Sequence, residues 1–125
     1  MSEVSYLEAK ELTLEDYEEF VKEEGFNPRQ AIAATFEDSV LMMKKSNKVY
    51  VSVMAKLSIL SLNQNFIPDY LLEKQEDLQK LEGLSEDEQS AYNLDMNNLN
   101  QLLRNRNFEV DKDEEYKSRV KMLLK

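Results

Sequence analysis

Apolar side chains recur along this chain at spacings of three and four residues, which is the repeat of a helix that buries one face. The clearest case follows Asn27 and Pro28, a pair typical of the start of a helix. Its apolar positions are Ile32, Phe36, Val40 and Met43. The same repeat predicts five or six amphipathic helices in all, and therefore an all-α protein built as a single compact bundle.

The start of the first helix is predicted from its capping pattern. Thr13 and Asp16 have the spacing of a helix start, and Gly25 is expected to end the helix. Residues 1–12 would then form a mobile N-terminal segment of one helical domain that spans residues 1–125.

The most apolar stretch, from Val49 to Leu62, allows two interpretations. Val49, Val51 and Val53 alternate with other residues as in a β-strand. The stretch nevertheless continues for about fourteen residues without a breaker, and this length favours a helix. Such a helix would be apolar on nearly all sides, so we expect it at the centre of the bundle.

Three further helices are predicted after this stretch. The fourth would begin at Pro68 and end at Gly83, and Ser85 opens a capping box for the fifth. A loop over residues 105–110 would separate the fifth helix from a last one capped by Asp111.

Charge is unevenly distributed along the chain. The 125 residues include 25 acidic and 16 basic side chains, which gives a net charge of −9. Residues 1–25 hold nine acids and two bases, and residues 67–88 hold eight acids and two bases. Charge on an exposed helix face usually contributes only solubility, but an acidic face can also attract a cationic partner.

The candidate partner-binding residues are acids on the predicted polar faces of the first and fourth helices. They are Glu15, Glu18, Glu19, Glu23, Glu73, Glu76 and Asp77. Met42 and Met43 add a second indication of a contact surface, because at least one of two adjacent methionines is expected to face outward.

The residue types that carry most enzymatic and metal chemistry are missing. Without His or Cys there is no thiolate nucleophile, no Cys/His zinc site and no histidine general base. Asp111, Asp113 and Glu115 are spaced like the start of a calcium loop, but Tyr116 stands where that loop needs glycine and Met122 where it needs glutamate. We therefore expect neither an enzyme nor a metal site nor a cofactor.

Three stretches of the chain resemble small helical immunity proteins, which are encoded beside bacterial polymorphic or contact-delivered toxins. They are the segment from Gly25 to Asp38, which contains Asn-Pro-Arg-Gln-Ala-Ile-Ala, then Val49 to Leu62, then Phe66 to Leu71. The resemblance implies a protein that binds a cognate toxin stoichiometrically and neutralises it in the producing cell. The acidic charge agrees with this function, because toxins that act on nucleic acids tend to be basic and an acidic inhibitor associates with them faster.

The alternative is a helical interaction module or accessory protein of phage or mobile-element origin, including a nucleic-acid mimic. The first residues show no basic and apolar leader, so we expect a cytoplasmic protein. The longest apolar stretch is interrupted by serines and a lysine and is too short to span a bilayer. An acidic chain also binds phosphate backbones and anionic lipids poorly, so we expect no membrane association and no direct nucleic-acid binding.

Overall fold

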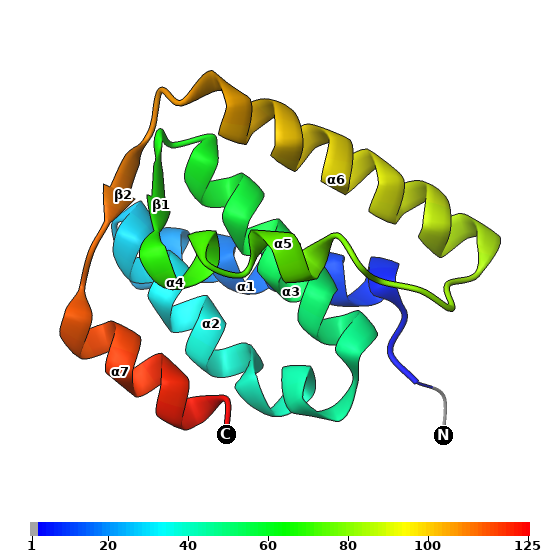
Figure 1. Cartoon of the computed structure of the whole chain (residues 1–125). Coiled ribbons are helices and arrows are strands. Elements are labelled where there is room, and N and C mark those ends of the chain that lie inside the picture. The colour runs from blue at the N-terminus through cyan, green and yellow to red at the C-terminus, as the bar shows by residue number, and fades with distance from the viewer. Residues whose placement is uncertain (1–2) are drawn as a thin grey trace.

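Four long helices form the body of the protein, for which a computed structural model describes residues 3–125. Helices α1 (Tyr6–Lys22), α2 (Pro28–Lys45) and α3 (Asn47–Leu62) run back and forth and pack against one another. Helix α6 (Glu86–Asn105) covers another side of α3 and also contacts α1 (Figure 1). The all-α prediction is therefore confirmed.

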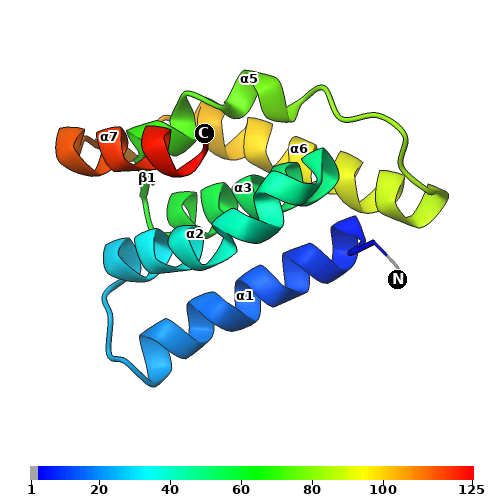
Figure 2. The same ribbon diagram turned by 90° about the horizontal axis from the view of Figure 1, so that it is seen from below.

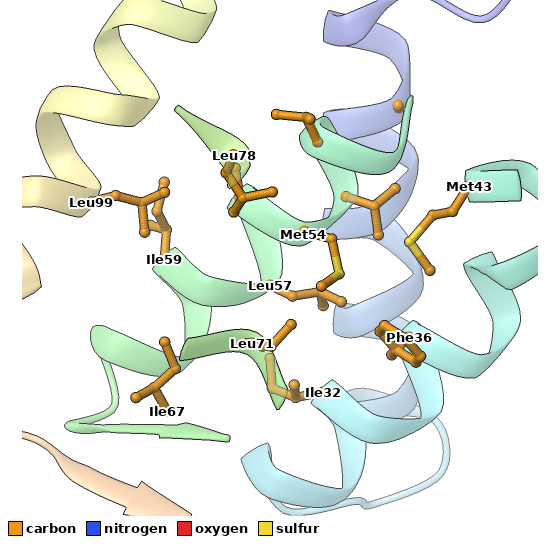
Figure 3. Close-up of a cluster of buried hydrophobic side chains, with 14 of the residues drawn as sticks. Ile32, Phe36, Met43, Met54, Leu57, Ile59, Ile67, Leu71, Leu78 and Leu99 are labelled. Carbon is orange, nitrogen blue, oxygen red and sulfur yellow. The ribbon is translucent and has the colours of Figure 1, made fainter. Parts of the chain in front are cut away.

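Helix α3 lies at the centre of this arrangement, between α1 and α2 on one side and α6 on the other (Figure 2). Met54 and Leu57 of α3 are fully buried and meet Phe36 from α2 and Leu71 from the segment that follows α3 (Figure 3). The prediction of a central helix over the stretch ending at Leu62 is confirmed. The length of the stretch therefore predicted the correct element. The alternating valines are compatible with this helix because a helix that is buried on all sides needs no polar face.

Serine hydroxyls make the polar positions of α3 compatible with its burial. Ser58 Oγ donates to the Met54 carbonyl oxygen at 2.8 Å, and Ser52 Oγ donates to the Tyr6 carbonyl oxygen at 2.7 Å. These bonds satisfy hydroxyls that would otherwise be costly to bury. The second bond also ties the start of α1 to the central helix.

The first helix begins earlier than its capping pattern predicts. Ser5 caps α1 and forms a capping box with Glu8, and Thr13 is buried inside the helix, where its hydroxyl donates to the Ala9 carbonyl oxygen at 2.7 Å. The predicted start of the helix at Thr13 was therefore wrong. The expectation of a mobile segment over residues 1–12 was wrong from Tyr6 onward, and residues 1 and 2 lie outside the described part of the chain. The side chain of Tyr6 is fully buried.

The fourth helix predicted from Pro68 to Gly83 is absent as a continuous element. The structure has a strand β1 (Phe66–Pro68) followed by two single turns, α4 (Asp69–Leu72) and α5 (Gln75–Leu78). The Gln75 side chain turns inward, and its Nε2 donates both to the Leu71 carbonyl oxygen and to Ser58 Oγ at 2.9 Å. In a continuous helix, the Leu71 carbonyl oxygen would accept a hydrogen bond from the Gln75 backbone N–H. Here it accepts one from the Gln75 side chain instead.

The last part of the chain returns to β1 and then crosses to α2. Strand β2 (Glu109–Asp111) pairs with β1 in parallel, with Phe66 opposite Glu109. Asp111 therefore belongs to a strand and does not cap the last helix as expected. Helix α7 (Glu114–Leu123) is capped by Asp113 and packs on α4.

Candidate partner-binding surface

The structure separates the two groups of predicted acidic residues. Glu15, Glu19 and Glu23 are exposed on α1, and Glu18 beside them is half-buried and pairs with Lys22 at 3.2 Å. Of the other three residues, Glu73 directly follows α4, and Glu76 and Asp77 lie on α5. Figure 2 shows α5 on the opposite side of α3 from α1. The two groups thus cannot form one continuous surface.

Within the second group, Glu73 already has a partner inside the protein. Lys117 of α7 donates to its carboxylate, and this hydrogen bond lowers the pKa of Glu73 below its usual value. Glu76 and Asp77 are exposed on α5. Glu73 therefore helps to dock α7, and the acidic surface available at this end is smaller than predicted.

A groove between α1 and α2 collects acids of the first group together with residues that were not predicted. It measures about 330 Å³. We call it the acidic groove, and its lining residues are Leu12, Glu15, Asp16, Glu19, Asp38, Ser39 and Met42. Two of the predicted partner-binding residues, Glu15 and Glu19, thus form one wall of a concave site.

Asp16 of α1 and Asp38 of α2 meet across this groove. Partial burial, followed by a hydrogen bond to the Asp38 carboxyl and by the negative charges of Asp38 and Glu19, raises the pKa of Asp16 to about 6. At neutral pH the groove therefore holds like charges in close contact, which is an unfavourable arrangement for the protein alone. A cation placed between the two carboxyls would relieve it.

No lysine or arginine among the described residues 3–125 occupies that position. Other carboxylates that face a neighbouring helix have basic partners: Asp95 pairs with Lys10 at 2.8 Å, and Glu88 with Lys48 at 3.2 Å. Across residues 3–125, by contrast, no lysine or arginine lies within ion-pair distance of the groove carboxylates. These are Glu15, Asp16, Glu19 and Asp38.

Apolar side chains border the acidic groove and reach solvent. Leu12 on its α1 side is 48% exposed, and Met42 lines its α2 side and is partly exposed. Met43 is buried while Met42 is only partly so, as expected for two adjacent methionines. The surface thus combines negative charge with apolar area, as protein-binding surfaces often do.

Two of the three acids that resemble the start of a calcium loop have partners within the protein. Asp111 pairs with Arg29 at 3.0 Å, and Asp113 accepts a hydrogen bond from the Tyr116 backbone N–H at 2.9 Å. Over the described part of the chain, no three acidic side chains are grouped closely enough to hold a metal ion. No helix there is both long and apolar enough to cross a membrane.

Comparisons with protein-family models, with curated proteins and with solved structures find no match to this chain. The resemblance to immunity proteins therefore stays a prediction, and the acidic groove is the feature of the structure that bears on function.

Proposed function

We propose that this protein is a non-enzymatic immunity protein that acts in the cytoplasm of a bacterial cell, where it binds and neutralises a cognate toxin. Its acidic groove would receive a lysine or arginine side chain of the toxin, placed between Asp16 and Asp38. The observation that carries the proposal is the set of groove carboxylates without a basic partner in residues 3–125.

The energetics of the groove support a binding function over simple solubility. Solvated surface charges usually lie far enough apart to avoid repulsion, whereas Asp16 and Asp38 line the same groove, and partial burial together with the neighbouring Asp38 raises the pKa of Asp16 to about 6. A site that lowers the stability of the free protein is common where residues serve binding. A cation from the partner would turn this repulsion into attraction.

The apolar border gives such a partner a second kind of contact. The aliphatic stem of a lysine or arginine can lie along Leu12 and Met42 while its charged end reaches the carboxylates. Glu15 and Glu19, at the exposed edge, would mainly speed the encounter with a basic surface.

The test uses the toxin encoded beside the gene for this protein, with binding kinetics measured at several salt concentrations. We expect Glu15→Lys with Glu19→Lys to slow association by about tenfold at low salt and to reduce its salt dependence. Both side chains are exposed, so the melting temperature should change little. The matched control is Glu76→Lys with Asp77→Lys, which makes the same change of charge on the other side of the protein.

Cell survival gives the second measurement. Cells that express the toxin with the groove variant should lose protection, and cells with the control variant should keep it. Full protection and unchanged association with the groove variant would refute the assignment of this surface.

A further inference from the structure

A second concave site is lined by residues of α4 and α7. Figure 2 shows α7 on the side of the protein away from α1. It measures about 200 Å³. We call it the basic pocket, and its lining residues are Tyr70, Glu73, Lys74, Lys117, Val120, Lys121, Leu124 and Lys125. Four lysines in one small site are unexpected in a protein with a net charge of −9.

The lysines of the basic pocket differ in what they contact. Lys117 donates to Glu73 and lies 3.6 Å from Asp69, so its charge is balanced within the protein. Lys74, Lys121 and Lys125 form no ion pair with any residue of the described chain. These three lysines can therefore still contact an anion from outside, although the charges of Lys121 and Lys74 also contribute to lowering the pKa of Glu73.

The floor of the basic pocket is apolar. Lys117, Val120, Lys121 and Leu124 are spaced as one face of α7 that turns toward α4. Val120 is the only residue of α7 that is buried, and Leu124 is covered only in part. Helix α7 thus contributes apolar side chains to a pocket that is also lined by lysines.

We infer that the basic pocket binds an acidic segment of a partner protein, with one apolar side chain in the pocket and neighbouring carboxylates on the lysines. The pocket is smaller than the usual range for small-molecule sites, about 300–1,000 Å³, and suits a single large side chain. Its charge is opposite to that of the acidic groove. The inference therefore does not depend on the proposed toxin-binding function.

The surroundings of the pocket favour a short acidic segment over an extended polyanion. Glu76 and Asp77 on α5 and Glu114 at the start of α7 are all exposed. A nucleic acid bound along the lysines would also lie against these carboxylates, which would repel its phosphates. Nucleic acids need several phosphate contacts to bind well. An anionic membrane would meet the same repulsion over a wider area.

The test measures binding of a labelled short peptide in which one phenylalanine is flanked by aspartates and glutamates, using fluorescence anisotropy. Lys121→Gln with Lys125→Gln should weaken binding by about tenfold, because two charged contacts are lost. Leu124→Gln should weaken it as well, because the apolar floor becomes polar. Lys80→Gln with Arg104→Gln is the matched control, since it removes two exposed cations outside the pocket and should leave binding unchanged.

Comparison ligands separate this inference from general attraction of anions. The same peptide with serine in place of phenylalanine should bind more weakly than the original, as should a single-stranded oligonucleotide and vesicles containing phosphatidylserine. The inference is overturned if the full-length protein does not bind the phenylalanine peptide, if the pocket variants bind it like the control, or if any comparison ligand binds as tightly.

Discussion

Glu88 joins three parts of the protein through one carboxylate. Its Oε2 accepts a hydrogen bond from the Tyr6 backbone N–H at 2.8 Å and lies 3.2 Å from Lys48 Nζ. Its Oε1 accepts from the Ser85 backbone N–H at 3.1 Å. The bond from Tyr6 contributes most to lowering the pKa of Glu88 to about 2, and the contacts to Ser85 and Lys48 add to it. Glu88, which completes the capping box begun by Ser85 at the start of α6, thus also holds the first turn of α1.

Replacing Glu88 with Gln is expected to lower the free energy of unfolding by about 1–3 kcal/mol at pH 7, because charge-assisted hydrogen bonds are lost. The pKa of Glu88 lies below the usual value of 4.5, so its contribution is fully present above that pH. It is lost as the pH falls from 4.5 toward 2, and the difference between the two proteins should shrink over this range.

Urea unfolding at several pH values measures this difference. Glu86→Gln is the control, since Glu86 lies in the same turn of α6 but is exposed. An equal effect of the two substitutions, or a difference that persists at low pH, would contradict the assigned role of Glu88.

Among the long helices and α7, α3 has the most buried residues and α7 the fewest. Eleven residues of α3 are buried, whereas Val120 alone is buried in α7. Helix α7 is held instead by polar contacts, such as the Tyr116 hydroxyl that donates to the Ala33 carbonyl oxygen at 2.9 Å and the Arg119 pair with Glu37 at 3.2 Å. Such contacts near solvent add little stability.

Hydrogen exchange should therefore be much faster in α7 than in α3. Local opening of α7 exposes little apolar surface, while opening of α3 requires global unfolding. Mass spectrometry of exchanged peptides measures both helices in one experiment. Substituting Tyr116 with Phe should speed exchange in α7 and leave α3 unchanged, and equal protection of the two helices would show that α7 is part of the cooperative core.

Sequence patterns predicted the starts of α2 and α6, which are set by nearby residues, but missed the equally local capping box of Ser5 and Glu8 at the start of α1. Asn27 with Gln30 and Ser85 with Glu88 form capping boxes in the structure, and each pair is only three residues apart. The break of the fourth helix depends on Gln75 reaching Ser58 of α3, a contact that no local pattern shows. Strands of three residues, such as β1, are likewise too short to leave a periodic signal.

The same distinction applies to the candidate site. Glu15 and Glu19 were predicted because acids on one helix face are visible in the sequence. The local pattern indicates Asp16 only as part of a helix start and gives no sign of Asp38, because their contact arises only when α1 and α2 pack together. On the α2 side of the groove, the sequence offers one indication of a contact surface, the adjacent residues Met42 and Met43.

For the molecule as a whole, the acidic groove makes stability depend on pH in the sense opposite to Glu88. The pKa of Asp16 is raised from 3.8 to about 6, so its stabilising protonated form is fully present below 3.8 and is lost as the pH rises through 6. Asp16→Asn should therefore stabilise the protein at pH 7 by up to about 1 kcal/mol, since it removes like-charge repulsion at a partly exposed site. The gain should disappear near pH 4.

Melting temperatures at pH 4 and pH 7 check this expectation. Glu11→Gln is the control, since Glu11 is an exposed carboxylate of the same helix outside the groove. The same Asp16→Asn variant should bind a cationic partner more weakly, so stability and binding should change in opposite directions. A variant that is less stable than the original at pH 7 would show that the carboxyl pair is not repulsive.

The parallel pairing of β1 with β2 has a consequence for a chain that is still being synthesised. Phe66 and Ile67 are made before α6, but their strand partner, which begins at Glu109, is made after it. Helix α3 can pack on part of β1 as soon as both have been made. The backbone N–H and C=O groups of β1 can pair with β2 only after most of the remaining chain has been made. On the ribosome, therefore, the first three helices can assemble while this strand still has an open edge, and that edge is the part of the unfinished protein on which a chaperone would act.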